Sequence, residues 1–341
     1  MIEKGYKLWV KEVNDRGGLL GRPVKLVLYD DKSDRTLTGK LYRRLIEDDK
    51  VDLVLSPYSS PLTSEASIIT EEHGKLMLAV AAASVQPWQR GHRYLFQLYA
   101  PANRQFMGIL DMMARKRYRT LALLYDETSP FNIDIANGIR RWAKLFKIEI
   151  TLDVSFKKGK EELPDLVSKV KETDPTGLIL SAYPPDSYLL FDLLKSENYK
   201  PKILSMPIVP AHPGFLKKIG SFGNNVMGPS QWEPIERIPF PGTKEFIKNF
   251  ERYTGHAPSF HATSAYAACQ ILEQAAIQKG SLDQQKMRNH IAALDTVTVL
   301  GRFKVDPTGL QIGHNSIIIQ WQNWKKEIIW PRKMRTAQPQ L

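Results

Sequence analysis

Residues 14–23 read Asn-Asp-Arg-Gly-Gly-Leu-Leu-Gly-Arg-Pro, and the apolar run 24–29 and the acidic pair 30–31 follow at once. Upstream, one apolar helical face has the spacing i, i+3, i+4, i+7, formed by Tyr6, Trp9, Val10 and Val13. The two glycines at 17–18 can take the positive φ that ends a helix, and a proline at 23 cannot prolong one. The stretch therefore predicts a helix, a glycine-hinged turn and a strand over 24–29 that stops at two acids.

The length and the cysteine usage set the broad class. At 341 residues the chain exceeds a comfortable single core, so two domains are expected. No window reaches the apolar length that spans a bilayer, and no apolar secretory segment precedes the first helix. The single cysteine, Cys269, cannot form an internal disulfide and lies in an apolar, helix-like stretch. We expect a thiol buried in the core rather than a nucleophile.

The formal net charge of +12 raises the possibility of a nucleic-acid partner. The densest basic run, 115–119, lies between a predicted helix and a predicted strand, where basic residues favour the helix dipole and need no partner. The sequence contains no zinc-finger, helix-turn-helix or RRM signature. We therefore expect no nucleic-acid partner and no direct insertion into a membrane.

Strand-like and helix-like segments alternate along most of the chain. The predicted strands are 51–55, 76–80, 121–124, 148–154, 178–180 and 202–205, and the predicted helices between them are 62–73, 106–113, 132–146, 163–170 and 187–194. Continuous apolar strands flanked by amphipathic helices indicate parallel sheets covered on both faces. Beyond residue 229 a proline-rich loop and three helices precede strands near Val299, and Ser281 with Gln284 predicts a capping box on the last helix. Two α/β lobes are expected, with a ligand at the carboxyl ends of the strands.

In this order the segments resemble the leucine/isoleucine/valine-type periplasmic binding proteins, the type I solute receptors of ABC importers. The matching stretches are 14–31, 51–57 (Val-Asp-Leu-Val-Leu-Ser-Pro), 123–126 (Leu-Leu-Tyr-Asp), 266–268 (Tyr-Ala-Ala), 280–283 (Gly-Ser-Leu-Asp) and 301–309 (Gly-x-Phe-x-Val-Asp-x-x-Gly). The resemblance implies two Rossmann-like lobes with parallel sheets, joined by a hinge of several crossings. One lobe would comprise 1–117 and 245–309 and the other 118–244 and 310–341, with the ligand cleft between them.

The resemblance has one departure. Family members begin with a strand and loop ahead of the first helix, whereas this chain starts inside or at that helix, so the central strand of the first sheet is expected to be missing. A truncated or mis-started product and a lobe that closes differently are the alternatives. Since the same stretch would carry a signal peptide, a periplasmic or extracytoplasmic location is implied only by the resemblance.

Motifs for catalysis and metal binding are absent from the sequence. There is no Gly-x-Ser-x-Gly elbow, no phosphate loop, no Gly-x-Gly-x-x-Gly after a strand and no His-Glu-x-x-His. His256 and His261 lack a third convergent ligand, and the acid pairs 30–31 and 48–49 fall at element ends, where solvated caps explain them. We expect no enzyme activity, no metal and no cofactor.

Binding is better supported in the first lobe. The loop 56–60 stands between a buried strand and a helix N-terminus, where hydroxyls and N–H groups suit a carboxylate. By alignment with the family, Ser60 takes the position of the serine that holds the ligand's carboxylate, with Tyr58 and Ser59 beside it. A simple N-cap serine is the alternative.

The second loop of this lobe, 81–84, aligns with the family segment that supplies a backbone amide and a threonine hydroxyl to the same carboxylate. Its candidate residues are Ala81, Ala82, Ala83 and Ser84. The family's threonine falls on Ala83, so that hydroxyl is lost unless Ser84 replaces it. A plain small-residue turn is the alternative.

In the second lobe the resemblance points to aromatic residues. Phe131 stands where the family usually has a tyrosine, and Tyr183 fits the aromatic residue that faces the ligand; such rings offer a large contact area. A core role is the alternative for Phe131. Trp232, in the crossing region, is a further candidate, with hinge packing as its alternative.

The loop 206–210 bears on the chemistry of the ligand. Amino-acid-binding members place a glutamate here to neutralise the ligand's ammonium, but this loop, which contains Val209, has no acid. A buried ammonium without a counter-charge is costly. A carboxylate with an apolar or aromatic body therefore fits better, although Asp186 or Glu233 could restore the charge and keep amino acids possible.

Taken together, the sequence predicts an extracytoplasmic solute-binding protein that delivers a small carboxylate-bearing ligand to an ABC transporter permease by closure of its lobes. The alternatives are a ligand-sensing domain of a regulator or receptor with the same fold, and an enzyme of unknown type.

Overall fold

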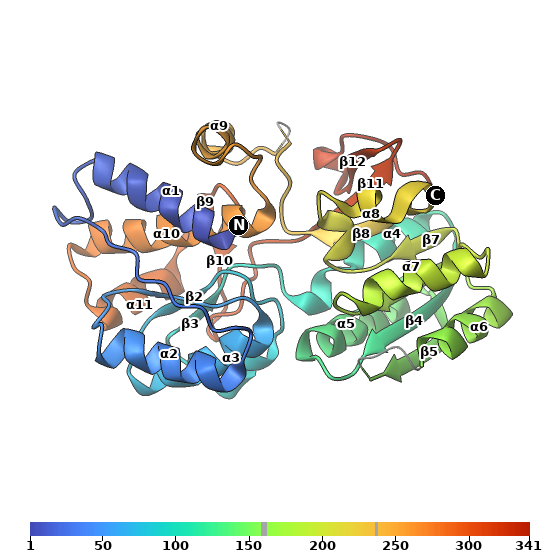
Figure 1. Ribbon diagram of the computed structural model, residues 1–341, viewed down its shortest axis with the longest axis horizontal. Helices are drawn as coiled ribbons and strands as arrows, with labels where there is room; N and C mark the ends of the chain where they lie inside the picture. The colour runs from blue at the N-terminus through green and yellow to red at the C-terminus, as the bar shows by residue number, and fades with distance from the viewer. Residues whose placement is uncertain (158–161, 236–237) are drawn as a thin grey trace. The chain divides into compact units, whose positions relative to one another are not determined.

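The computed structural model describes residues 1–157, 162–235 and 238–341. These residues form two compact units (Figure 1). Unit 1 comprises Met1–Pro101 and Gln231–Asn315, and unit 2 comprises Ala102–Ser230 and Ser316–Leu341. These boundaries differ from the expected ones at 117, 244 and 309. One reason is that helix α4 (Met107–Arg115) packs on elements of unit 2, where the backbone of Gly108 lies against the side chain of Trp330.

Unit 1 is built on a short parallel sheet in the order β1-β2-β3. Its strands are β1 (Val54–Leu55), β2 (Met77–Ala79) and β3 (Leu95–Gln97). Its helices are α1 (Ile2–Asp15), α2 (Arg35–Glu47), α3 (Ser60–Glu72), η1 (Gln86–Arg90), α9 (Thr243–Thr254), α10 (Phe260–Lys279) and α11 (Gln284–Ala293). An antiparallel pair, β9 (Asp295–Thr298) and β10 (Gly301–Lys304), completes the unit.

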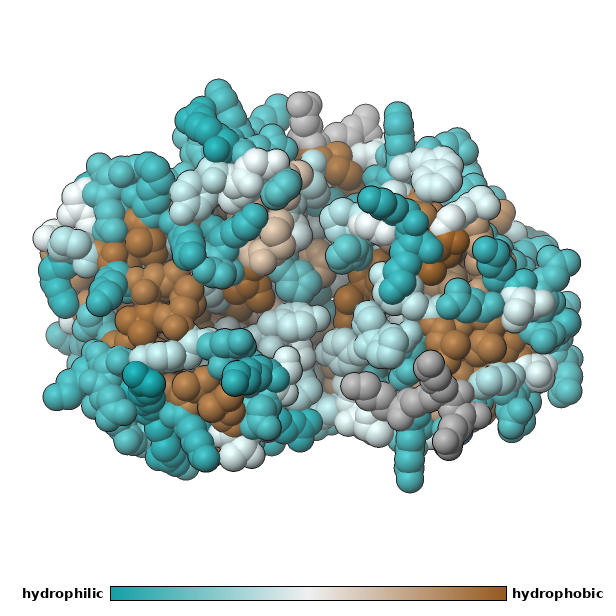
Figure 2. Space-filling model, viewed as in Figure 1, coloured by the Kyte–Doolittle hydropathy of each residue, from teal (hydrophilic) through white to brown (hydrophobic). Residues whose placement is uncertain are grey.

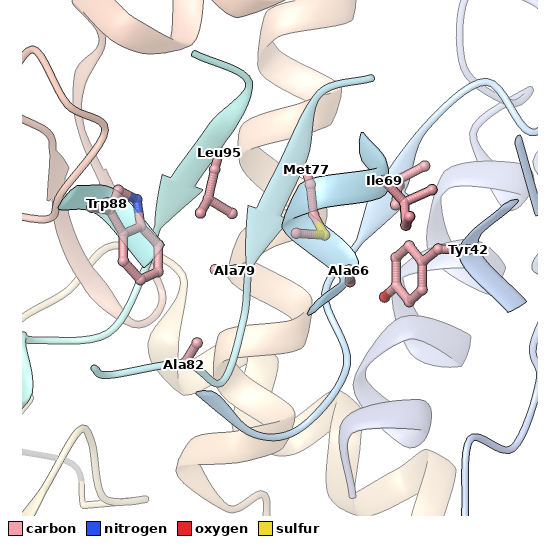
Figure 3. Packing of buried hydrophobic residues seen from close by; sticks show 9 residues of the cluster. Tyr42, Ala66, Ile69, Met77, Ala79, Ala82, Trp88 and Leu95 are labelled. Atoms are coloured by element: carbon pink, nitrogen blue, oxygen red, sulfur yellow. The ribbon is translucent and has the colours of Figure 1, made fainter. Parts of the chain in front are cut away.

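The core of unit 1 lies where α2 and α3 cover the sheet (Figure 3). Ile69 of α3 and Met77 of β2 are buried in this cluster together with Tyr42 of α2. The Tyr42 hydroxyl donates to the carbonyl oxygen of Leu55 at 2.7 Å, which ties α2 to the end of β1. Of the apolar runs predicted as strands, 51–55 is a strand only at its last two residues and 76–80 only at its centre.

The turn after α1 has the predicted geometry, but the strand predicted after it is wrong. Gly17 and Gly18 adopt φ angles of 98° and 84° after the last residue of α1. Residues 25–29 make no backbone hydrogen bond with any described residue, and β1 pairs only with β2. A strand requires a neighbour, and an apolar pattern alone does not supply one. Leu28 and Tyr29 are consequently exposed, and a hydrophobic area covers the face of unit 1 that this stretch crosses (Figure 2).

The capping box predicted for α11 is also wrong. Asp283 is the N-cap, and its carboxylate accepts from the N–H of Lys286 at 2.8 Å. The Ser281 hydroxyl accepts instead from the N–H of Asp283, and the Gln284 side chain accepts from the N–H of Leu76. A distant backbone donor therefore competes for the glutamine, which local spacing cannot reveal.

Unit 2 contains a seven-stranded sheet in the order β12-β11-β8-β7-β6-β4-β5. Its strands are β4 (Thr120–Asp126), β5 (Glu149–Phe156), β6 (Gly177–Ser181), β7 (Ile203–Ser205), β8 (Met227–Ser230), β11 (Ile317–Gln322) and β12 (Lys325–Trp330). Strands β4 to β8 are parallel; β4 to β7 were predicted, and β8 was missed. Strands β11 and β12 are antiparallel to each other because a two-residue turn joins them, and β11 also pairs antiparallel with β8.

Helices flank this sheet, and the α/β fold class is therefore confirmed (Figure 1). They are α4, α5 (Pro130–Phe146), α6 (Leu163–Thr173), α7 (Asp186–Ser196), α8 (Phe215–Ile219) and the short 3₁₀ turns η2 (Ala102–Arg104), η3 (Val209–Ala211), η4 (Gly220–Gly223) and η5 (Arg332–Met334). No helix within the described ranges is long and apolar enough to cross a bilayer.

The expected burial of Cys269 is confirmed, and two residues of the basic run 115–119 have partners within the chain. In the basic run, Arg115 pairs with Asp111 at 2.9 Å and Arg119 donates to the carbonyl oxygen of Phe146 at the end of α5, so these charges have structural partners. Cys269 is buried in α10, and burial raises the pKa of its thiol. A neutral, inaccessible thiol is not a nucleophile.

Helix α1 packs on α10 through the predicted apolar face. Tyr6, Trp9 and Val13 are buried, and the Trp9 indole donates to Glu273 at 2.7 Å. The two backbones approach closely at Gly5, where an added Cβ would lie 2.4 Å from the carbonyl oxygen of Ala262.

This close contact predicts that alanine substitutions at two helical glycines change the free energy of unfolding in opposite directions. Gly5→Ala should lower the free energy of unfolding by about 1–3 kcal/mol, because overpacking forces α1 away from α10. Gly39→Ala in α2, where the nearest atoms lie 3.9 Å from the new Cβ, should raise it by about 0.5–1 kcal/mol through helix propensity. Urea unfolding of both variants measures this, and equal effects would mean that α1 does not depend on the close contact.

Candidate functional site

Two predicted loops of unit 1 come together at the carboxyl ends of its parallel strands. The hydroxyl oxygen of Ser60, the first residue of α3, accepts from the N–H groups of Ala83 and Ser84, each at 3.1 Å. Nearby, the Ser56 hydroxyl accepts from the N–H of Val80 at 3.0 Å. The loop after β1 and the loop after β2 are therefore joined by buried serine hydroxyls.

The bonds of Ser60 leave one hydrogen-bonding capacity unused. A serine oxygen has two acceptor lone pairs and one O–H donor. Because two amides occupy the lone pairs, the hydroxyl hydrogen remains for an acceptor. No described residue accepts from the N–H of Ala81 or Ala82 either, although both residues are buried. Together with the positive end of the α3 dipole, these donors suit an anion such as a carboxylate.

Ser60 is not the N-cap residue of α3, which was the alternative considered for it. Ser59 is the N-cap of α3, and its side chain makes no capping hydrogen bond. Ser60 lies inside the first turn of α3, where its hydroxyl accepts from backbone amides of the loop 81–84. The ligand role predicted for Tyr58, Ser59 and Ser60 stays a prediction.

A buried glutamine that sequence reasoning missed fixes the loop 81–84. The Gln97 side chain donates to the carbonyl oxygens of Ala82 and Ser84, at 3.1 and 3.3 Å, and accepts from the N–H of Gln311. Its position at the end of β3 was the available signal, since the carboxyl ends of parallel strands share an edge.

Aromatic rings stand beside these loops. Tyr58, which is 43% exposed, lies 5.1 Å from the His261 ring in α10. Tyr99 follows β3 and lies 6.4 Å from the same histidine. Burial raises the pKa of Tyr99, so its hydroxyl stays protonated, and this hydroxyl has no hydrogen-bond partner among the described residues. Sequence reasoning missed Tyr99 and the contact of His261 with this loop.

Trp232 belongs to unit 1, where it is buried and its ring lies 6.2 Å from the Phe246 ring of α9. Phe246 in turn lies 4.8 Å from Tyr266 of α10. These contacts agree with the packing alternative for Trp232, and its ligand role stays a prediction.

In unit 2, Phe131 and Tyr183 lie together. Their ring centroids are 5.5 Å apart, with Phe131 in the first turn of α5 and Tyr183 in the loop between β6 and α7. Phe131 is buried and Tyr183 is partly buried. The two predicted aromatic residues thus share the carboxyl edge of one parallel sheet, as strand order requires.

The same edge carries a buried polar network. The Asp126 carboxylate, at the end of β4, accepts from the N–H and hydroxyl of Thr128 and from the Asn132 amide. The Asn132 oxygen accepts from the Ser181 hydroxyl at 3.1 Å. The Asp126 carboxylate therefore bonds to residues two and six positions further along the chain.

Ser129 is a candidate that sequence reasoning missed. It is the N-cap of α5 but makes no side-chain capping bond, and its buried hydroxyl has no partner among the described residues. The signal was a serine before a proline at the start of a helix.

The remaining predicted residues fall on both units. Val209 is buried at the start of η3, within the acid-free stretch 206–210 that follows β7. Asp186 opens α7 in unit 2, whereas Glu233 belongs to unit 1, and both are buried. In the part of the chain that the structure describes, no group of three or more His, Cys, Asp or Glu side chains could hold a metal ion.

Comparison with known proteins identifies the class. The pattern of the periplasmic binding protein family matches residues 1–326, and the chain belongs to this family. Two Brucella suis biovar 1 relatives are similar over nearly the whole chain. Leu/Ile/Val-binding protein homolog 7 is 22% identical (96% of this chain, 86% of the relative), and homolog 1 is 24% identical (94% and 85%). The predicted resemblance is confirmed.

Solved structures with the same fold include two with different ligands. LivJ of Streptococcus pneumoniae in complex with isoleucine has a TM-score of 0.84 at 20% identity, covering 97% of this chain and 94% of that one. A solute binding protein of an ABC transporter from R. palustris in complex with benzoate has a TM-score of 0.79 at 17% identity, covering 96% and 90%. These are binding proteins and not enzymes, as the absence of enzyme motifs predicted.

Alanine substitutions at two adjacent serines test the hydrogen bonds that link the loop 56–60 to the loop 81–84. Ser60→Ala should lower the free energy of unfolding by about 2 kcal/mol, because it leaves two buried amides without an acceptor. Ser59→Ala should change it by less than about 0.5 kcal/mol, because that side chain makes no capping bond. Thermal and urea unfolding measure both, and a neutral Ser60→Ala would contradict the proposed joint.

Proposed function

We propose that this protein is the extracytoplasmic solute-binding component of an ABC-type importer and that it binds a small molecule through a carboxylate. The observation that carries this proposal is the set of donors around Ser60: one hydroxyl hydrogen, the N–H groups of Ala81 and Ala82, and the N-terminus of α3. Family membership supports it. The isoleucine, leucine and benzoate bound by structurally similar proteins have only the carboxylate in common as a charged group.

The proposed mechanism is closure on the ligand. The carboxylate binds unit 1 at the start of α3, and unit 2 then contacts the rest of the molecule with Phe131 and Tyr183. Contacts to both units exist only in the closed form, so the ligand favours closure by the free energy of those additional contacts. A permease that recognises the closed form would then accept only loaded protein.

For the ligand we infer an apolar or aromatic body without an α-ammonium group. The loop 206–210 after β7 has no acid, so this loop offers an ammonium no counter-charge. An ammonium in apolar surroundings needs a counter-charge. The rings of Phe131 and Tyr183 and the buried Val209 fit a hydrocarbon instead.

Matched pairs of ligands test this inference. 4-Methylpentanoate differs from leucine, and 3-phenylpropanoate from phenylalanine, only by the missing amino group. At a hundred times its Kd a ligand adds about 2.7 kcal/mol to the free energy of unfolding. We expect the thermal midpoint to rise with the two acids and with benzoate, and to rise much less with the two amino acids.

A carboxamide analogue, 4-methylpentanamide, is the control for the carboxylate and should not stabilise the protein. Greater stabilisation by leucine than by 4-methylpentanoate would refute the ligand class but leave the binding function in place. Stabilisation by the amide as strong as by the acid would refute the carboxylate site at Ser60.

A further inference from the structure

The first turn of α5 holds a buried hydroxyl that the fold leaves without a partner. Ser129 is the N-cap residue, only 7% exposed, and its hydroxyl makes no hydrogen bond with any described residue. An N-cap serine ordinarily accepts from the N–H of the second or third residue of its helix. Here those residues are Phe131 and Asn132, and neither N–H has an acceptor within the described ranges. The turn therefore offers three hydrogen-bond donors that no described group uses.

These donors lie beside the aromatic pair of unit 2. Helix α5 follows β4, so its first turn starts at the carboxyl edge of the parallel sheet, as does the loop after β6 that holds Tyr183. The Phe131 ring, whose own N–H is one of the three donors, lies 5.5 Å from the Tyr183 ring. Thr128 is exposed and Pro130 is partly buried, so the chain is close to the surface at Ser129. A solute whose ring contacts the aromatic pair would bring its substituents to this turn.

The stability of the fold does not explain this serine. A buried polar group without a hydrogen-bond partner destabilises a folded protein, and such groups are few. Other groups hold the turn: the Asp126 carboxylate accepts from the side chains of Thr128 and Asn132, and the carbonyl oxygen of Ser129 accepts from the N–H of Ile133. An alanine at this position would keep all of these bonds. An oxygen of a bound solute is the partner that gives the hydroxyl a purpose.

Charge in the same turn decides the kind of oxygen. The positive end of the α5 dipole alone would favour an anion. However, the Asp126 carboxylate bonds the Asn132 side chain at 3.3 Å and brings a negative charge close to the donors, so it repels a second carboxylate. A neutral hydroxyl group avoids this repulsion. It also acts in both directions, because its oxygen accepts from the backbone N–H groups while its hydrogen goes to the Ser129 oxygen, which has two unused lone pairs.

We propose that Ser129 and the first turn of α5 bind a neutral hydroxyl group on the body of the solute, away from its carboxylate. The solute oxygen accepts from the N–H groups of Phe131 and Asn132, and its hydrogen is donated to the Ser129 oxygen. Because the aromatic pair lies beside this turn, the hydroxyl belongs to a ring. The solute class is thus a hydroxylated aromatic acid. This inference rests on the proposed function and narrows the ligand class given there.

Calorimetric titration of the full chain with matched acids tests the proposal. The parent acids are benzoate and 3-phenylpropanoate, and the comparison acids carry one hydroxyl at the 3- or 4-position of the ring. At least one hydroxylated acid should bind the wild type about tenfold more tightly than its parent, because its hydroxyl meets donors that otherwise lack a partner. The methoxy and carboxy derivatives at the same position should bind no more tightly than the parent, since an ether has no hydrogen to donate and a carboxylate is repelled.

Two serine variants of unit 2 locate the partner of the solute hydroxyl. Ser129→Ala should remove most of the tenfold preference and leave the affinity for the parent acid unchanged. Ser196→Ala is the matched control, because this serine is the last residue of α7, at the end of the helix away from Tyr183, and it should keep the preference. Since the Ser129 hydroxyl has no partner among the described residues, Ser129→Ala should also keep the thermal midpoint of the ligand-free wild type.

The outcomes separate this inference from the proposed function. If the parent acids bind and no hydroxylated acid binds more tightly, the inference is wrong and the binding function stands. A preference that Ser129→Ala retains would overturn the role of Ser129, and a carboxy derivative that binds more tightly than the hydroxylated acid would overturn the neutral class. If no acid of the set binds, this inference and the carboxylate site of the proposed function fail together.

Discussion

Buried polar side chains hold the loops of unit 1, because its sheet is too short to do so. β1 has two residues and β2 and β3 have three each, so the ladder supplies few hydrogen bonds. Ser56, Ser60 and Gln97 provide the missing partners for backbone groups of residues 80–84. A buried amide without a partner costs about 1–3 kcal/mol, so these side chains decide where the loop lies.

In unit 2 a buried acidic side chain, Asp126, fixes the segments at the strand ends. Asp126 and Asn132 close a network onto Ser181 across the carboxyl ends of β4 and β6, and the aromatic pair lies on this rigid edge. The carboxylate accepts from Thr128 and Asn132, so it fixes the start of α5 against the end of β4.

Sequence reasoning succeeded where an element carries its own signal. The apolar face of α1, the parallel strands β4 to β7 and the buried Cys269 need no knowledge of distant partners. It failed where the partner is remote: residues 24–29 lack a neighbouring strand, and Gln284 bonds Leu76 instead of capping its helix. For the site, loop positions were predictable from strand ends. The positions of Gln97 and Ser129 carried weak signals of this kind, but their roles and that of Tyr99 were not predictable, because burial and unused donors depend on tertiary packing.

The unpaired stretch 25–29 has a consequence for handling the protein. Its amides have no hydrogen-bond acceptor among the described residues, so their protons should exchange in heavy water long before those of β2. Exposed Leu28 and Tyr29 accompany this row of free N–H and C=O groups, and such an edge readily accepts an added strand. Concentrated solutions should therefore self-associate first at this stretch, through main-chain pairing between molecules.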